Sequence, residues 1–133
     1  MKSAVLLDPL YLASGLERID RLKKGLPASI FATLAADLSL SSATLAVCLG
    51  LSPRTLRNRA RKLTTDEAQR SFRAFRVFRR ATDVFQSEET ARDWLKESQR
   101  ALGERKPIEL LGLDVGAEEV LNVLGAIEEG SYL

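Results

Sequence analysis

The stretch that decides the fold is Ser41–Lys62, SSATLAVCLGLSPRTLRNRARK. Its first half predicts a short helix, because a serine can cap its start and Leu45 and Leu49 lie about one helical turn apart. Gly50 then stands where helices commonly end, since glycine adopts a positive φ without a steric clash. The Ser-Pro pair that ends at Pro53 suits the beginning of a second helix. Two short helices joined by a tight turn are typical of a helix-turn-helix.

The second of these helices is predicted to run from Pro53 to Leu63 and to carry two different faces. One face packs against the core, and the other presents guanidinium and amide groups that can contact base edges in the major groove of DNA. The side chains that we predict to face the groove are Arg54, Arg57, Asn58 and Arg61. Near the helix start, the side chains predicted to contact phosphate are Ser52 and Thr55. The alternative is that these arginines only solvate an exposed helix.

The composition is that of a globular protein and excludes several kinds of chemistry. With 133 residues, 45% hydrophobic and 29% charged, the chain suits one compact domain or two small ones that share a core. It has one cysteine and no histidine, which excludes an internal disulfide, a histidine-containing catalytic triad and the usual zinc sites. We therefore predict no catalytic residue, no metal and no cofactor, and we expect Cys48 to be a small buried hydrophobe.

Nothing in the sequence predicts contact with a membrane. There is no run of about eighteen apolar residues of the kind that spans a bilayer. Asp8 and Pro9 interrupt the short apolar patch near the N-terminus, which argues against a signal peptide. A single thiol fits a reducing compartment, so we predict a cytoplasmic protein.

The charges are distributed unevenly along the chain. Residues 1–50 carry a net charge of +1, residues 51–80 carry +8, and residues 81–133 carry −7. The total of +2 therefore hides a centre that attracts polyanions and an acidic C-terminal part. Such a division suggests two different partners.

Helical spacing of apolar residues continues on both sides of the opening stretch. The predicted helices span 15–24, 28–37, 66–85 and 114–128, with a short helix after Ser87 and one or two turns at 107–112. This predicts an all-α fold of roughly seven helices. The apolar side of 66–85, which we predict to be core, consists of Ala68, Phe72, Phe75, Phe78 and Phe85. The opposite side, which either is solvated or extends the phosphate-binding surface, carries Arg70, Arg73, Arg76 and Arg80.

The order of short motifs in the C-terminal half resembles the toxin-binding domain of Xre/MbcA/ParS-type antitoxins, which are encoded beside RES-domain toxins. The matching motifs are Phe85, ARDWL at 91–95, ALG at 101–103, KPIELL at 106–111, Gly116-Ala117, Val120, Leu124-Gly125, Ile127-Glu128 and Gly130. Upstream, GLSPRTL at 50–56 and Leu63-Thr64 resemble the Xre-like helix-turn-helix of the same family. Together the likeness covers roughly residues 14–133.

This resemblance implies an Xre-like helix-turn-helix bundle followed by a small helical toxin-binding domain. The corresponding division is 1–65 for the N-terminal helices and DNA-binding region, 66–85 for a connecting helix and 86–133 for toxin binding. It further implies a type II antitoxin that inhibits a cognate RES-type toxin, a protein similar to NAD⁺-consuming ADP-ribosyltransferases. Family members repress their own operon by binding operator DNA, usually as a homodimer or within a larger toxin–antitoxin complex.

The acidic C-terminal segment is the predicted toxin-binding surface, since Pro107–Leu133 contains six acids and no base. Its last residues can occlude a basic site for the NAD⁺ diphosphate; alternatively the tail is frayed and the last helix alone binds the toxin. The predicted toxin-binding residues are Pro107, Gly116, Val120, Leu124, Ile127, Glu128, Glu129, Gly130, Tyr132 and Leu133. A second class of function also fits the sequence: a stand-alone helix-turn-helix repressor whose acidic domain serves dimerisation or binds a ligand.

Overall fold

A computed structural model describes residues 1–58 and 61–130 of the chain, apart from the side chain of Thr55. Within these residues the fold consists of seven α-helices and three short 3₁₀ helices without any strand, which confirms the all-α prediction. The elements are α1 (Ala4–Leu12), α2 (Gly15–Lys24), α3 (Ser29–Asp37), α4 (Ser42–Cys48), η1 (Pro53–Leu56), α5 (Thr65–Phe85), α6 (Glu88–Lys96), η2 (Arg100–Leu102), η3 (Pro107–Leu110) and α7 (Asp114–Glu128).

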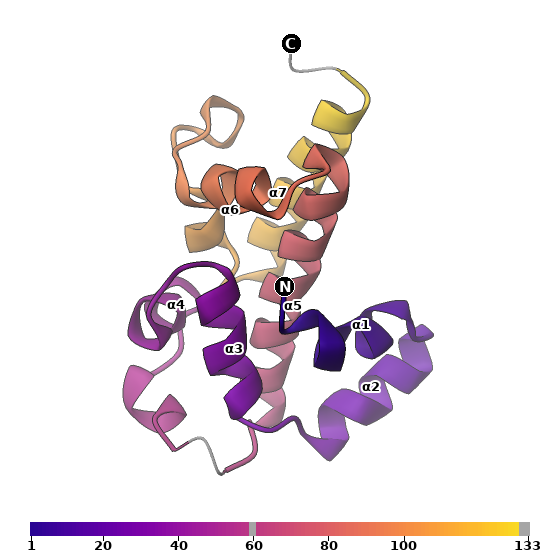
Figure 1. The fold of residues 1–133 in the computed structure, drawn as a ribbon, viewed down its shortest axis with the longest axis vertical. Coiled ribbons are helices and arrows are strands. Elements are labelled where there is room, and N and C mark those ends of the chain that lie inside the picture. Colours follow the sequence, from indigo (N-terminus) through magenta and orange to yellow (C-terminus); the bar gives the residue numbers. More distant parts are fainter. Residues whose placement is uncertain (59–60, 131–133) are drawn as a thin grey trace.

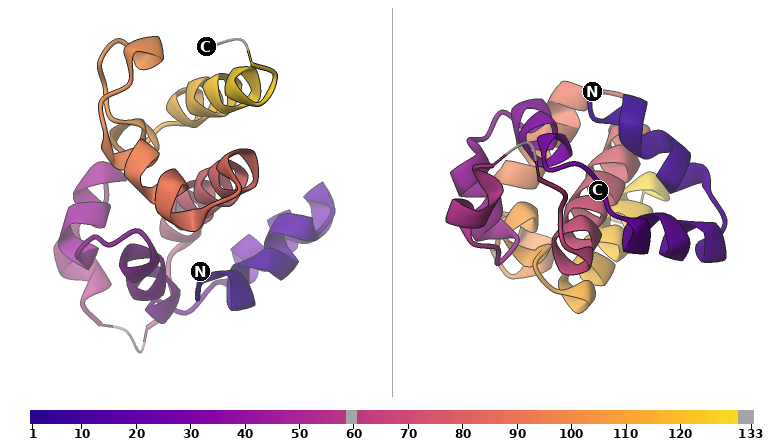
Figure 2. Two further views of the ribbon diagram at one scale, coloured as in Figure 1. Left: turned by 45° about the horizontal axis from the view of Figure 1, so that its top comes forward. Right: turned by 90° about the horizontal axis from the view of Figure 1, so that it is seen from below.

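The long helix α5 runs through the middle of the molecule (Figure 1). The helices α1 to α4 lie around its first half, and α6 and α7 lie beside its second half, an arrangement that the turned views of Figure 2 also show. The apolar stripe of α5 is buried at Phe72, Phe75 and Phe78, as predicted, while Phe85 is partly buried against Trp94. One helix thus supplies core side chains to both halves of the fold.

Two arginines of α5 donate hydrogen bonds to backbone carbonyls at the ends of neighbouring elements. Arg70 donates a hydrogen bond of 2.8 Å to the carbonyl of Leu49, directly after α4. Arg73 donates to the carbonyl of Leu111 at 3.1 Å and pairs with the carboxylate of Asp114. Asp114 is the first residue of α7, and its carboxylate accepts from Arg73, while no side chain caps that helix. Carbonyls at helix ends lack intrahelical donors, so these arginines supply them and join α5 to both halves.

Helix α1 forms where the sequence predicts only an interrupted apolar patch. Leu7 and Leu10 are buried in the core, and Asp8 pairs with Arg79 of α5 at 3.2 Å. Pro9 lies inside the helix on its exposed side. The hydrogen bond that proline removes costs less here than burial of the two leucines contributes, because each buried leucine stabilises the fold by roughly 1.5–3 kcal/mol.

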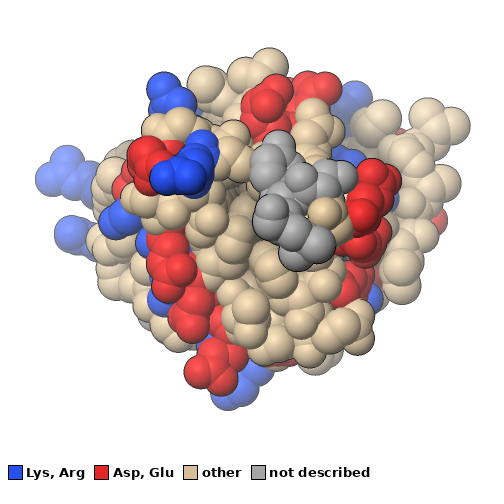
Figure 3. Space-filling model, turned by 90° about the horizontal axis from the view of Figure 1, so that it is seen from above, with Lys and Arg blue, Asp and Glu red and all other residues tan. Residues whose placement is uncertain are grey.

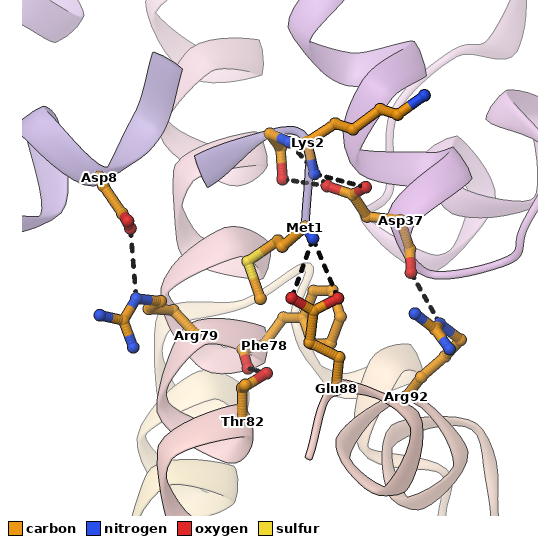
Figure 4. Close-up of polar contacts among 10 residues, drawn as sticks. Met1, Lys2, Asp8, Asp37, Phe78, Arg79, Thr82, Glu88 and Arg92 are labelled. Carbon is orange, nitrogen blue, oxygen red and sulfur yellow. Dashed lines mark hydrogen bonds and ion pairs between the residues drawn. The ribbon is translucent and has the colours of Figure 1, made fainter. Parts of the chain in front are cut away.

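The start of α1 is held by groups from α3 and α6 (Figure 4). The amino group of Met1 donates to both carboxylate oxygens of Glu88, at 2.9 and 3.0 Å. The backbone N–H of Lys2 donates to the carboxylate of Asp37 at 2.9 Å, and the carbonyl of that aspartate accepts from Arg92 at 2.7 Å. These partners lie far away in the sequence, and they fix α1 against the rest of the molecule.

The first helix of the helix-turn-helix forms as predicted, but the second does not. The hydroxyl of Ser41 accepts from the backbone N–H of Thr44 and caps α4, whose Leu45 is buried. The expected helix from Pro53 to Leu63 is wrong in length, because it is a single 3₁₀ turn, η1. The helical spacing that placed four polar side chains on one face therefore does not hold beyond this turn.

Backbone hydrogen bonds with the segment between α2 and α3 explain why the second helix does not continue to Leu63. The N–H of Ala28 donates to the carbonyl of Arg61 at 3.0 Å, and the N–H of Leu63 donates to the carbonyl of Leu26 at 2.7 Å. These bonds flank an antiparallel bridge and require extended backbone. A capping box at Thr64 then starts α5. Residues 61–63 consequently join two other elements instead of continuing a helix.

The beginning of α7 packs against η3 so closely that only glycine fits at position 116. A Cβ atom added to Gly116 would lie 1.9 Å from the carbonyl oxygen of Leu110. Gly125, further along the same helix, has nothing within 4 Å of an added Cβ. The packing around α7 therefore excludes a side chain at Gly116 and leaves room for one at Gly125.

We predict that Gly116→Ala lowers the free energy of unfolding by about 1–3 kcal/mol, because the backbone must shift to admit the methyl group. Gly125→Ala is the matched control, expected to stabilise by about 0.5–1 kcal/mol through the better helix propensity of alanine. Urea unfolding followed by circular dichroism measures both values. A Gly116→Ala variant as stable as the parent protein would contradict the packing described here.

Candidate functional site

The exposed basic surface of the helix-turn-helix is centred on η1. Arg54 and Arg57 have exposed side chains, as expected for residues that contact DNA. Ser52 and Asn58 are exposed on either side of η1 and each takes part in an interaction within the protein. The side chain of Thr55, predicted to contact phosphate, lies outside the described part of the structure. The structure thus places Arg54 on η1 and Arg57 directly after it.

Arg61 does not lie where the sequence predicts it. Its guanidinium group donates two hydrogen bonds of 2.8 Å, one to each carboxylate oxygen of Glu67, and a third of 2.9 Å to the carbonyl of Lys62. The Glu67 side chain is 10% exposed, and its hydrogen bond with Arg61 raises the pKa of the arginine. A bidentate pair of this kind is a fixed structural contact. Arg61 therefore holds the start of α5 and is not presented as a groove-facing side chain.

The residues predicted to bind a toxin differ in their exposure. Those buried in the core are Pro107, Val120 and Leu124. Those partly buried are Gly116 and Ile127. Those exposed are Glu128, Glu129 and Gly130. Those outside the described part of the structure are Tyr132 and Leu133. The buried residues position α7 and, in this conformation, offer no surface to a partner.

Glu128 is exposed but paired within the chain. Arg80 of α5 donates to both of its carboxylate oxygens, each at 2.9 Å. This contact holds the pKa of Glu128 below its usual value, so the pair stabilises the fold at neutral pH and is lost as the pH falls through that lowered pKa. Four arginines were predicted opposite the phenylalanine stripe. Three of them, Arg70, Arg73 and Arg80, donate hydrogen bonds to other elements, whereas Arg76 is exposed.

An apolar hollow of about 520 Å³ lies among η2, η3 and the start of α7. Leu102, which is buried, and Leu110, which is partly buried, form part of its wall. Leu113 and Val115 lie at its edge and have 66% and 65% of their surface exposed. Apolar side chains so exposed beside a hollow are typical of a binding surface. The sequence motifs do not predict this site, although Val115 lies on the side of the predicted helix opposite Val120 and Leu124, which is a signal that can be recognised.

Acidic side chains accompany the hollow. Glu109 and Glu119 line it together with one base, Arg105. In the view onto the end of the molecule that carries α6 and α7, further acidic side chains lie on several sides of the surface (Figure 3). The hollow itself thus combines an apolar centre with two acids and one base.

The described residues offer little else with chemical function. Cys48 is half-buried, and burial together with Glu109 raises the pKa of its thiol, which is the environment of an unreactive cysteine. No cluster of three or more metal-ligating side chains occurs in this part of the chain. Nor does it contain a single helix long and apolar enough to cross a membrane; α3 and α4 pass that test only as a pair bent by 91°.

Comparison with known proteins agrees with this division into two surfaces. Residues 17–76 match a family model for the antitoxin Xre-like helix-turn-helix domain, and residues 80–130 match one for the antitoxin Xre/MbcA/ParS C-terminal toxin-binding domain. The boundary between the two matches falls within α5. The hollow and α7 lie inside the second match, and η1 lies inside the first.

Three curated relatives span most of the chain. An "Antitoxin Xre" of Photorhabdus laumondii is 32% identical over 82% of this chain and 76% of its own length. Another "Antitoxin Xre", of Yersinia enterocolitica, is 28% identical over 86% of this chain and 80% of its own length. A "Prs ADP-ribosylating antitoxin" of a Sphingobium species is 28% identical over 92% of this chain and 85% of its own length. The chain belongs to the Xre/MbcA/ParS family of antitoxins, with an Xre-like helix-turn-helix followed by a C-terminal helical domain.

Proposed function

We propose that this chain is a type II antitoxin that neutralises a RES-type, NAD⁺-consuming toxin by direct contact through α7 and the adjacent apolar hollow. The observation that carries the proposal is the pair Leu113 and Val115, exposed at the rim of the hollow within the region similar to a toxin-binding domain. Two large apolar side chains in such a position suit the centre of a protein interface, where burial supplies most of the binding free energy.

The acidic character of the C-terminal segment supports the choice of toxin. A site that binds the diphosphate of NAD⁺ is basic, and carboxylates such as Glu119 and Glu129 complement it while apolar contacts supply affinity. Glu128 contributes less, since Arg80 already neutralises it. The name of the Sphingobium relative also connects an antitoxin with ADP-ribosylation. Whether the last residues enter the toxin active site stays a prediction.

Growth rescue tests this function directly. The chain is co-expressed with the RES-type toxin of the same operon, and Val115→Asp is compared with Val47→Asp, an equally apolar residue of α4 that is 69% exposed. We expect Val115→Asp to lose rescue and to bind the toxin at least about tenfold more weakly, because an aspartate buried at the interface lacks a partner. Val47→Asp should retain both properties. Full rescue by the Val115→Asp variant would contradict the proposed surface.

The proposal includes repression of the chain's own operon through the helix-turn-helix. Arg54 on η1 and Arg57 directly after it are exposed, in the region where a helix-turn-helix approaches DNA. Either phosphate or guanine can accept hydrogen bonds from their guanidinium groups. Since Arg61 is committed to Glu67, DNA contacts from this region are assigned to η1 and the residues next to it.

Operator binding measured by fluorescence anisotropy over a range of salt concentrations tests that assignment. If Arg57 contacts a base, Arg57→Ala should weaken operator binding by roughly 1–3 kcal/mol. If Arg57 contacts phosphate, the same substitution should lower the slope of log K against log salt concentration by about one. Arg100→Ala, which changes a fully exposed arginine of the C-terminal half, is the matched control and should change neither quantity. Unaltered binding by both Arg54→Ala and Arg57→Ala would remove η1 from the DNA interface.

A further inference from the structure

Three of the six lysines of the chain lie at one end of the molecule. Lys23 and Lys24 belong to the last turn of α2, and Lys62 lies between η1 and α5. The end of α2, η1 and the beginning of α5 share the end of the molecule that is farthest from the C-terminus (Figure 1). All three lysine side chains are exposed. We call these three residues the lysine cluster.

Backbone contacts hold the two segments that carry the lysine cluster side by side. Pro27 and Lys62 form the antiparallel bridge described above. The side chain of Lys62 lies against Gly25, the residue directly after Lys24, because a Cβ atom added to this glycine would be 3.3 Å from Cδ of Lys62. The end of α2 and the segment before α5 therefore present their lysines on one continuous surface.

The lysine cluster adjoins the element that we assign to DNA. The backbone N–H of Arg61 donates to the carbonyl of Asn58 at 3.3 Å. This hydrogen bond brings the residues directly after η1, which include the exposed Arg57, next to the bridge that holds Lys62. Exposed bases from the end of α2, from the segment before α5 and from η1 are thus neighbours.

Carboxylates of the protein do not neutralise the lysine cluster. Within residues 1–58 and 61–130, none of its three ammonium groups forms an ion pair, whereas the acids that follow Lys62, Asp66 and Glu67, pair with Arg70 and Arg61. The negative end of the helix dipole explains bases in the last turn of α2, but it does not explain Lys62 on a separate segment. Uncompensated bases on neighbouring segments are typical of a surface that binds a polyanion.

We propose that the lysine cluster binds the phosphate backbone of DNA beside the base pairs that η1 approaches. A lysine ammonium group is a compact point charge, which suits phosphate and carries no sequence information, whereas the arginines at η1 can also bind guanine. The cluster therefore adds affinity for any duplex and fixes the position of η1 along it. The inference rests on the proposed function in that η1 contacts the same DNA, and it makes α2 part of the DNA interface.

Fluorescence anisotropy of the full chain without toxin, on an operator duplex and on an unrelated duplex of equal length, tests the lysine cluster. The cluster variant combines Lys23→Gln, Lys24→Gln and Lys62→Gln. The control variant combines Lys2→Gln, Lys96→Gln and Lys106→Gln, which changes the other three lysines and gives the same net charge.

The cluster variant should bind both duplexes at least about tenfold more weakly. It should also lower the slope of log K against log salt concentration by about two to three, because each lost phosphate contact lowers that slope by about 0.9. Lys62→Gln alone, which leaves the backbone bridge in place, should lower the slope by about one. The control variant should change neither quantity, and circular dichroism checks that all variants fold.

The two duplexes separate this inference from the assignment of η1. If Arg57→Ala weakens operator binding while the folded cluster variant and Lys62→Gln bind as the parent does, the lysine cluster is wrong and η1 keeps its role. If the lysine substitutions lower the salt slope on both duplexes while the η1 substitutions change nothing, the cluster binds DNA and the assignment of η1 is wrong. An equal loss in the control variant, or a parent protein that binds neither duplex, would overturn the inference.

Discussion

The fold depends on α5 being shared between two cores. Its phenylalanines are buried among helices from both halves of the chain, and three of its arginines reach outward to α4, α7 and the turn between η3 and α7. In a small protein, two independent cores of about sixty residues each would bury a smaller fraction of their surface. A common helix avoids that loss and holds the DNA-binding and C-terminal regions in a fixed relation.

This sharing explains what happens to the strong positive charge in the middle of the sequence. Residues 51–80 carry a net charge of +8, which suggests one large surface for phosphate. In the structure, Arg61, Arg73 and Arg80 instead pair with carboxylates, two of which belong to the acidic C-terminal half. The opposite charges of the two halves therefore serve partly to join them. Among the described bases of this segment, those that remain exposed are Arg54, Arg57, Lys62 and Arg76.

The sequence predicts the parts of the fold that local pattern determines. The helices at 15–24 and 66–85 and the burial of the phenylalanine stripe follow from apolar spacing and capping residues, and the structure confirms them. One helix was predicted with the wrong length and another was not predicted, because contacts with residues distant in the sequence determine both. Helix α1 contains Pro9 and is held by Asp37 and Glu88, which no local pattern reveals. The second helix of the helix-turn-helix is cut short by hydrogen bonds to residues 26 and 28. The hollow, likewise, is assembled from three separate segments.

Because α5 supplies buried side chains to both halves, the two halves should unfold as one cooperative unit. Hydrogen–deuterium exchange through a urea titration, resolved separately for α3 and α7, tests this most directly, since these helices lie on different halves of α5 (Figure 1). If α5 is shared, loss of either core exposes the phenylalanines of the other, and both helices should lose protection at the same urea concentration. Two well-separated transitions, with α7 open while α3 remains protected or the reverse, would contradict the claim.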